Sequence, residues 1–479
     1  MSSPPKSHAA PAPDVSSSLR ERLSRLSADR LTLLLPATTI AGVGVATFLW
    51  RTLVWQPAVR VDGWAYAAWG QALARGERPL FDLGATTPKP LAALLGFLVV
   101  PLPPERAFAV VAALALAALA ASLFAVAYRA GGTIAAAISV VALLVGARLN
   151  VVLAFGYIDA VVSALILVGI ALRGRLRVAA LVLAGLLRPE AWVLAAVAGF
   201  SETAGPLRRR AGGALVAGVI APALWILSDV ALIRDPLGTL HWASYRRGEL
   251  AVVNVPWTEV PGEFWSALTE EVSAVVAIAG VLGLALHFLR TRRGLAADPL
   301  PVAVVVVWPL LLVLETHYGG LNPRYLFPVV PLLALGCGLL AAQLLRSLLR
   351  MRSPWPGVAV AAGALVIATI SMGIGPGVPE QMARNAAIAE TRPAVESVLS
   401  CGRLGVTRRI AARDVIPQLA ASSRGSMYEF GIYRHGRRFA AVLHRTRRLR
   451  PADPALPPWP RYDTPLGPLA VAPACPPLE

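Results

Sequence analysis

Lysine is almost absent from this chain, and charged residues of either sign are scarce. Only 15% of the 479 residues are charged, and of the 45 basic residues just two, Lys6 and Lys89, are lysines. With 56% hydrophobic residues and a mean hydropathy of +0.62, this composition indicates a polytopic membrane protein rather than a soluble enzyme. Lys89 is therefore conspicuous, because arginine fills nearly every other basic position.

Clustered cysteines, a nucleotide-binding loop and a secretory leader are also missing. The three cysteines, Cys337, Cys401 and Cys475, lack metal-ligand spacing, so no zinc or haem site is expected. No glycine-rich nucleotide-binding loop occurs in the segments predicted to be cytoplasmic, which argues against a soluble nucleotide-linked donor. The first apolar segment, 31–50, is too long for a secretory leader and has no clear cleavage site, so we interpret it as an uncleaved anchor.

The basic charge, a formal net +18, lies in short arginine clusters between apolar runs. This distribution is typical of membrane proteins, and it makes a nucleic-acid partner unexpected. If residues 1–30 form a disordered cytoplasmic tail, every other loop that must lie inside contains arginine, as the positive-inside rule requires. The sequence therefore predicts a multi-pass protein of the cell membrane. These arginines are Arg129, Arg173, Arg175, Arg177, Arg208 to Arg210, Arg290, Arg292, Arg293, Arg346, Arg350 and Arg352.

Nine apolar segments are candidates to cross the bilayer. A tenth run, 178–200, is broken by Arg188-Pro189-Glu190 and flanked by arginines, which predicts a re-entrant pair of short helices. The expected fold is mainly α-helical, with a transmembrane domain over 31–375 and outer loops at 51–105 and 234–270. The nine segments are 31–50, 106–128, 131–147, 151–172, 211–233, 271–289, 299–317, 325–346 and 356–374.

The C-terminal region changes character at a Pro/Gly linker, 375–379, after which charge rises and apolar spans cease. Short apolar runs between turn residues predict a small extracytoplasmic α+β domain over 376–479. Cys401 and Cys475 both fall on the oxidising side, whereas Cys337 falls in a span, so we predict a disulfide between the first two. Two free thiols are the alternative.

The first outer loop contains a capped helix and the conspicuous lysine. Residues 63–75 predict a helix in the membrane interface with its aromatic rings at headgroup level. Asp62 is either a plain capping carboxylate or the base that glycosyl transfer to a hydroxyl requires. Lys89 is either a snorkelling interface residue or the cation that neutralises the phosphate of a lipid-linked leaving group.

This loop resembles that of the GT-C superfamily, integral-membrane glycosyltransferases that use polyprenyl-phosphate donors. Asp62-Gly-Trp-Ala-Tyr66, Phe81-Asp82 and Pro88-Lys89-Pro90 are similar to the protein O-mannosyltransferase and aminoarabinose transferase branch. The resemblance implies that Asp62 is the catalytic aspartate and that Lys89 contacts the donor phosphate. Arg324-Tyr325 resembles a later family element whose arginine approaches that phosphate. Gly63 and Pro88 depart from the family, which has acids at these places.

Polar residues that are rare in spans gather at the same depth as Asp62, the expected outer leaflet. Several have structural alternatives: Asp159 could pair with Arg148 for folding, and His317 could be a hydrogen-bonded interface residue. Arg188 and Glu190 could line the groove for the lipid tail, but we favour a buried ion pair that holds the helix break. The additional site candidates are Tyr66, Asp82, Asp159, His317 and Tyr325.

These patterns predict an inverting glycosyltransferase of the cell envelope. It would move a hexosyl or pentosyl group from a polyprenyl-phosphate donor to a hydroxyl of an extracytoplasmic glycan, lipid or protein, with membrane lipids around it. No cofactor is predicted, and a divalent-metal requirement stays open. The alternative is a transporter or flippase, which predicts matching helix breaks in two halves, whereas only the break at 188–190 is found. A membrane scaffold that displays the C-terminal domain is a third hypothesis.

Overall fold

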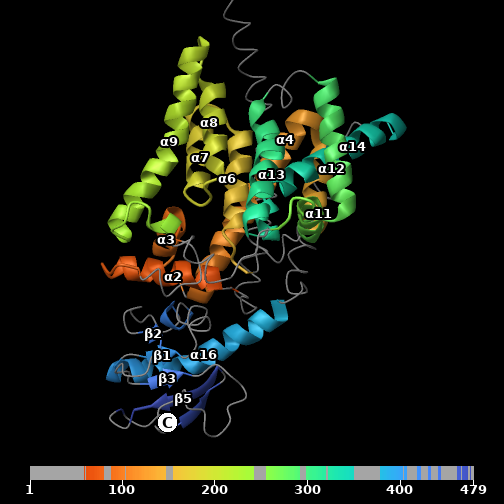
Figure 1. Cartoon of the computed structure of the whole chain (residues 1–479). Coiled ribbons are helices and arrows are strands. Elements are labelled where there is room, and N and C mark those ends of the chain that lie inside the picture. Colours follow the sequence, from red (N-terminus) through yellow and green to blue (C-terminus); the bar gives the residue numbers. More distant parts are fainter. Residues whose placement is uncertain are drawn as a thin grey trace, which may run out of the picture.

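The structure, a computed structural model, is a helical bundle with a smaller strand-containing part at one end (Figure 1). The predicted crossings at 31–50 and 356–374 lie outside the residues that it describes. The described residues are 59, 61–79, 88–102, 104–146, 155–241, 255–291, 298–319, 322–349, 378–402, 404–406, 418–421, 430–432, 441–443, 461–464, 466–472 and 475.

The bundle is built from long apolar helices, and two short helices lie at the end that faces the strands. Helix α2 runs across this end of the bundle in Figure 1, and we call it the α2 end. The helices of this part are α2 (Val61–Ala74), α3 (Pro90–Leu98), α4 (Pro104–Gly146), α6 (Asp159–Ala171), α7 (Arg175–Gly185), α8 (Ala191–Glu202), α9 (Leu207–Leu232), α11 (Val260–Glu271), α12 (Ala274–Arg290), α13 (Pro299–Gly319), the 3₁₀ helix η3 (Pro323–Leu326) and α14 (Val330–Leu349).

Helix α4 corresponds to two predicted crossings. It consists of two helices joined at Gly132, whose φ of 77° is open to glycine at little cost. At the end of the first half, Arg129 donates from NH2 to the carbonyl oxygen of Ala171, the last residue of α6, at 2.7 Å. Phe108, near its start, instead lies against Gly156, beyond the other end of α6. The first half of α4 therefore runs along the whole of α6.

Helices α7 and α8 form a hairpin whose tip contains Arg188. The backbone N–H of Gly174, which precedes α7, donates to Oε2 of Glu202, the last residue of α8, at 2.7 Å. Both ends of the pair therefore lie together at the end of the bundle opposite α2. The break between the two helices lies at the predicted position, where Pro189 and two charges interrupt the apolar pattern, and whether the pair is re-entrant stays a prediction.

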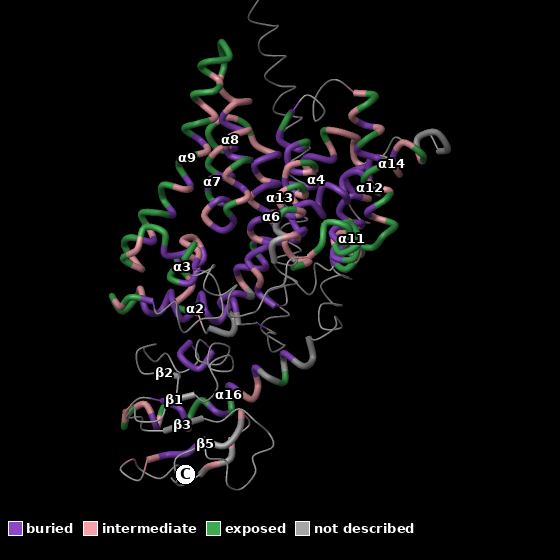
Figure 2. The backbone as a smooth tube through the Cα atoms, viewed as in Figure 1, coloured by how far each residue is buried: buried purple, intermediate pink, exposed green. Residues whose placement is uncertain are grey.

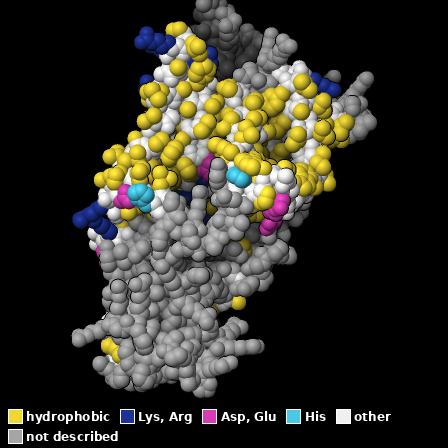
Figure 3. Space-filling model, viewed as in Figure 1, with side chains coloured by type: hydrophobic (Ala, Val, Ile, Leu, Met, Phe, Trp, Pro, Cys, Tyr) yellow, Lys and Arg dark blue, Asp and Glu magenta, His cyan; other side chains and the backbone are white. Residues whose placement is uncertain are grey.

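A broad apolar surface covers the side of the bundle formed by α9, α12 and α13. Large side chains are exposed along these helices, for example Leu207 (70%) and Leu289 (81%). Figure 3 shows hydrophobic side chains continuously over this face, with basic groups near its upper margin. Within the described part, Val110–Leu144 and Leu207–Leu232 are long and apolar enough to cross a membrane. Such a surface is stable in lipid and unfavourable in water.

Helices α12 and α14 approach closely through small residues. A Cβ on Gly283 would lie 1.9 Å from the carbonyl oxygen of Gly336, and a Cβ on Gly336 would lie 2.0 Å from that of Gly280. Helices in lipid associate through van der Waals packing, so glycines at a crossing bring the two backbones into contact. This contact fixes α14, which follows η3 along the chain.

The C-terminal part combines one long helix with a mixed sheet. Helix α16 (Val378–Cys401) precedes strands in the order β2-β1-β3-β5-β4; β1 pairs in parallel with β2 and β3, and β5 is antiparallel to β3 and β4. Cys401 and Cys475 lie at disulfide distance, with a Cα–Cα separation of 5.7 Å. The strands are β1 (Leu404–Val406), β2 (Phe430–Ile432), β3 (Ala441–Leu443), β4 (Arg461–Thr464) and β5 (Gly467–Val471).

Helix α2 is buried between the bundle and the C-terminal part (Figure 2). Trp64, Tyr66 and Trp69 are each at most 2% exposed, so the predicted placement of these rings at headgroup level is wrong. The reason is that the protein itself covers both faces. The Gln71 amide donates to the carbonyl oxygen of Ala421 at 3.1 Å, on the side of the C-terminal part. The aromatic pattern of this helix does not show whether lipid headgroups or another part of the protein will cover its rings.

Candidate active site

The structure brings Asp62 and Arg324 together from opposite ends of the bundle sequence. Asp62 lies in the first turn of α2, which begins one residue earlier than the predicted capping position. Arg324 lies in η3, and its NH1 donates to Oδ2 of Asp62 at 2.5 Å. A buried guanidinium–carboxylate pair is stronger than a surface pair because less water screens it.

Asp159 connects this pair to the tip of the hairpin. Its Oδ1 accepts hydrogen bonds from Arg188, at 2.5 Å from NH2 and 3.1 Å from Nε, and its Oδ2 lies 3.8 Å from Nε of Arg324. Arg188 NH1 also lies 3.5 Å from Oε1 of Glu190. The buried ion pair favoured for Arg188 is thus present, but it lies within the Asp62 cluster. Arg148, the other partner considered for Asp159, lies outside the described residues.

Asp159 occupies a different position in its helix from the one predicted. The apolar run 151–172 predicts one continuous span, whereas α6 begins at Asp159 itself. Gly156 lies in a turn with a φ of 67°, and Tyr157 is not helical, so the helix does not extend back through them. Asp159 therefore projects from the first turn of α6 at the α2 end.

Two tyrosine rings flank the arginines. The guanidinium carbon of Arg188 lies 3.5 Å from the ring centroid of Tyr325, and that of Arg324 lies 4.4 Å from the ring centroid of Tyr157. Desolvated cation–π contacts of this kind stabilise an arginine and restrict its orientation. Trp308 of α13 donates from Nε1 to the carbonyl oxygen of Tyr325 at 2.9 Å, which holds η3 against α13.

Lys89 lies beside this cluster, at the start of α3. Its backbone is extended, and the next helical turn is joined to the hairpin tip by Leu91 N–H donating to the Leu186 carbonyl oxygen at 3.4 Å. Burial, followed by the charge of Arg188, lowers the pKa of Lys89 to about 8. Within the described part of the chain, its ammonium makes no ion pair. Lys89 is thus a partly buried cation available to an anion.

Close packing of α2 on α3 fixes Asp62 relative to Lys89. A Cβ on Gly96 of α3 would lie 2.0 Å from the carbonyl oxygen of Tyr66, and one on Gly70 would lie 2.0 Å from the carbonyl carbon of Gly96. No side chain can occupy either position without separating the helices. The spacing between the helix with the carboxylate and the helix with the lysine therefore depends on two glycines.

Tyr66 lies one turn after Asp62 and is fully buried. Its ring packs on those of Trp69 and Phe108, with centroids 5.5 and 5.8 Å apart, and its hydroxyl has no hydrogen-bond partner among the described residues. Burial raises the pKa of Tyr66 well above 10, and the charge of Asp62 raises it further. The hydroxyl therefore stays protonated and has a proton to donate.

The predicted candidate His317 makes its contacts with another segment. His317 donates a hydrogen bond from Nδ1 to the carbonyl oxygen of Val255 at 2.8 Å, and its ring stacks on Trp257 with centroids 4.1 Å apart. These contacts attach the end of α13 to the segment before α11. Asp82 lies outside the described residues, as do most aromatic and basic residues of the loop after His241.

The cluster has the composition of an anion site with a carboxylate base. Lys89, Arg188 and Arg324 supply three cations, and Asp62 and Asp159 supply two carboxylates. Arginine forks suit phosphate oxygens, and a carboxylate can take a proton from a hydroxyl. No group of three metal-ligating side chains occurs in the part of the chain that the structure describes. Arg188 was not predicted as a site residue. Its charge in the middle of the apolar run 178–200 could have indicated it, because such charges are usually functional or paired.

Comparison with known proteins identifies the architecture. No protein-family model and no curated protein matches the sequence. Two solved structures are similar over most of the chain. ArnT from Cupriavidus metallidurans bound to undecaprenyl phosphate has a TM-score of 0.59 at 14% identity, covering 94% of this chain and 100% of that chain. ArnT in the apo state has a TM-score of 0.55 at 16% identity, covering 83% and 85%. The chain therefore shares its overall fold with these two ArnT structures.

Proposed function

We propose that this protein is a membrane glycosyltransferase of the GT-C type that transfers a sugar from a polyprenyl-phosphate donor to an acceptor hydroxyl with inversion at the anomeric carbon. The observation that supports this proposal is the convergence of Asp62 with Arg324 and Arg188 beside Lys89. One carboxylate and several cations in one buried cluster match the needs of this reaction. The similar ArnT structure contains undecaprenyl phosphate, which makes a polyprenyl phosphate the natural donor group to test.

Asp62 acts as the base in this proposal. The acceptor oxygen forms a bond to the anomeric carbon as its proton moves to the Asp62 carboxylate, and the bond from that carbon to the phosphate oxygen breaks. The polyprenyl phosphate leaves with the electron pair. One displacement step inverts the configuration, and it needs one base and a stabilised leaving group.

The cations stabilise the leaving phosphate. Among the described residues, the Lys89 ammonium has no ion pair, and the buried Nε of Arg324 has no hydrogen bond. Asp159 binds Arg188 through one oxygen and faces Arg324 with the other. Asp159 thus orients two guanidinium groups, which lowers the reorganisation needed when charge develops on the phosphate.

Arg324 has two competing partners in this mechanism. In the structure it donates to Asp62, and a carboxylate beside a guanidinium is a weaker base than one without it. The donor phosphate competes with Asp62 for the same guanidinium. Phosphate binding would therefore draw Arg324 toward the leaving group and restore the basicity of Asp62 when it is needed.

The proposal also assigns sides to the membrane. Arg129, Arg173 and Arg208 are exposed at or near the end of the bundle opposite α2. The positive-inside rule then favours the cytoplasm for that end, and the extracytoplasmic side for Asp62 and the C-terminal part. The acceptor would be an extracytoplasmic glycan, lipid or protein.

A direct test uses the purified protein in nanodiscs with radiolabelled polyprenyl-phosphate sugars and membrane extract as the acceptor source. We expect the label to move to an acceptor, and we expect Asp62→Asn to lower the rate by about 100-fold or more, since a general base contributes that much. Fully active Asp62→Asn protein would exclude the assigned base. Movement of intact labelled lipid between leaflets, without covalent transfer, would support a flippase instead.

A further inference from the structure

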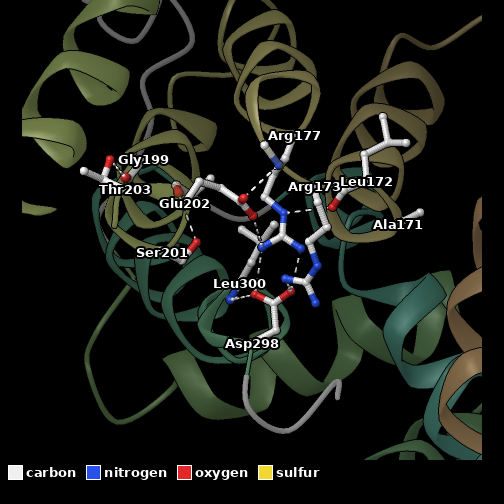
Figure 4. A network of polar contacts seen from close by, with 12 residues as sticks. Ala171, Leu172, Arg173, Arg177, Gly199, Ser201, Glu202, Thr203, Asp298 and Leu300 are labelled. Atoms are coloured by element: carbon white, nitrogen blue, oxygen red, sulfur yellow. Dashed lines mark hydrogen bonds and ion pairs between the residues drawn. The ribbon is translucent and has the colours of Figure 1, made fainter. Parts of the chain in front are cut away.

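A second ionic cluster lies at the end of the bundle opposite α2 (Figure 4). Arg177 is completely buried and donates to Asp298 from NH1 at 3.1 Å and from NH2 at 2.6 Å. The same NH1 lies 3.1 Å from Oε1 of Glu202, and Nε donates to the carbonyl oxygen of Leu172 at 3.1 Å. We call Arg177, Glu202 and Asp298 the ionic clasp.

The ionic clasp joins four segments that are separate in sequence. Leu172 directly follows α6, Arg177 lies in the first turn of α7, Glu202 ends α8, and Asp298 precedes α13. Asp298 also accepts a hydrogen bond from the N–H of Leu300 at 3.1 Å, so it caps α13. Arg173 also forms an ion pair with Asp298, with its NH1 2.9 Å from Oδ2, but its side chain is 59% exposed.

Each of these four segments has a charged residue of the candidate active site at or near its other end. Asp159 begins α6, Arg188 follows α7, Glu190 precedes α8, and Arg324 follows α13. Between Asp159 and Leu172 the helix rises by roughly 20 Å at 1.5 Å per residue. The ionic clasp is thus too far from the cluster to touch a substrate there.

Hydrogen bonds at the α2 end tie these segments to the cations. The tip of the α7–α8 hairpin accepts from Leu91 N–H, two residues after Lys89. On α13, Trp308 is fully buried and holds the carbonyl oxygen of Tyr325, next to Arg324. Two elements, the hairpin and α13, therefore carry the arginines at one end and are joined by the ionic clasp at the other.

We propose that Arg177 is a positioning residue whose ion pairs set the spacing between Arg188 and Arg324, and thereby the shape of the phosphate site. This inference rests on the proposed function, because it assigns those arginines to the donor phosphate. The buried charges also explain how the clasp holds its geometry. Removing one partner leaves an uncompensated charge in a buried site, so the segments must move to admit water or a new partner.

Substitution of Arg177 by glutamine tests the proposal, with Arg173→Gln as a matched control that removes a guanidinium from the same aspartate. For Arg177→Gln we expect the Kd for undecaprenyl phosphate and the donor KM to rise at least fivefold and kcat to fall, because the same arginines stabilise the leaving phosphate. For Arg173→Gln we expect less than a twofold change in each. Arg177→Lys retains the positive charge but cannot make the two parallel hydrogen bonds of a guanidinium. Its affinity for undecaprenyl phosphate should therefore lie between those of Arg177→Gln and the wild type.

Hydrogen–deuterium exchange gives a readout that does not depend on the proposed reaction. In Arg177→Gln, faster exchange is expected in peptides covering 186–191 and 322–327, which lie at the α2 end. Unchanged exchange in both peptides, or an unchanged Kd in folded, monodisperse protein, would overturn the positioning role. If Arg177→Gln does not fold, the milder Glu202→Gln is measured by the same criteria. Wild-type protein that binds no undecaprenyl phosphate would refute the proposed function, and the exchange result would still decide the positioning role.

Discussion

At the residue scale, the contact between Asp62 and Arg324 predicts how a substitution of Asp62 changes phosphate binding. If Asp62 competes with the donor phosphate for Arg324, Asp62→Asn should abolish transfer and yet bind undecaprenyl phosphate more tightly, by about fivefold. The reason is that the guanidinium no longer has a carboxylate partner at 2.5 Å. Isothermal titration or scintillation proximity binding measures the effect.

A double-mutant cycle separates competition from general electrostatics. In an Arg324→Gln background, Asp62→Asn should give no gain, because the shared partner is gone. Glu190→Gln removes a carboxylate from Arg188 in the same cluster and should give a smaller gain than Asp62→Asn. Equal gains with and without Arg324 would show that Asp62 only adds negative charge to the site.

The lowered pKa of Lys89 predicts how phosphate binding depends on pH. Its pKa of about 8 means that the ammonium is charged below that pH and loses its charge as the pH rises through it. A phosphate monoester is fully ionised above about pH 7, so only the lysine changes. The Kd for undecaprenyl phosphate should therefore rise above pH 8, by up to about tenfold per unit.

Arginine at the same position provides the control for this pH effect. Arginine stays protonated throughout the range, so Lys89→Arg should bind with a Kd that is flat from pH 7 to above pH 9, as measured by titration at each pH. A wild-type Kd that is independent of pH would show that Lys89 does not contact the phosphate.

Some of this site could be predicted from the sequence. Asp62, Lys89 and Arg324 are the residue types that the chemistry requires, and their local patterns differ from those of spanning segments. The pairing of Asp159 with Arg188 could not be predicted, because the two residues contact across 29 positions and no local pattern records such a contact. The position of His317 beside Val255 and Trp257 depends on the same kind of long-range contact.

At the element scale, the contact between α2 and α3 predicts a packing defect. Gly96→Ala places a methyl group 2.0 Å from the carbonyl oxygen of Tyr66, so the helices must separate, at a cost of about 1–3 kcal/mol. Separation also moves Asp62 from Lys89. We expect a lower melting temperature and at least a tenfold loss of transfer activity.

Gly212→Ala is the matched control for this contact. Gly212 lies within α9, and a Cβ there meets no atom within 4 Å. Alanine favours a helix more than glycine, so melting temperature and activity should be retained or slightly raised. If Gly96→Ala behaved like Gly212→Ala, the close contact would not set the geometry of the site.

The long helices were predictable and the helix starts were not. Helices α9, α12, α13 and α14 closely match predicted spans, because uninterrupted apolar runs of this length have few alternatives in a membrane. The start of α6 was predicted too early, since the residues before Asp159 are as apolar as a helix interior. Only the positive φ of Gly156 reveals the turn there.

At the scale of the whole molecule, the Cys401–Cys475 bond closes a loop over a sequence separation of 74 residues. Loop-closure entropy for this length corresponds to about 4 kcal/mol of stability. The double variant Cys401→Ser/Cys475→Ser should therefore be cleaved faster within the C-terminal part during limited proteolysis. In denatured wild-type protein without reductant, only Cys337 should be alkylated, and three alkylated thiols would exclude the bond.

The burial of α2 between the bundle and the C-terminal part has a consequence for biosynthesis. The carbonyl oxygen of Val59, just before α2, accepts hydrogen bonds from Gln381 at 3.0 Å and Asn385 at 3.2 Å, and Gln71 of α2 donates to Ala421. The ribosome makes these partners more than 300 residues after α2. The helix that carries Asp62 therefore completes its contacts only after the segment 381–421 has been made, so a nascent or truncated chain that ends before Gln381 lacks the contacts that hold this helix in place.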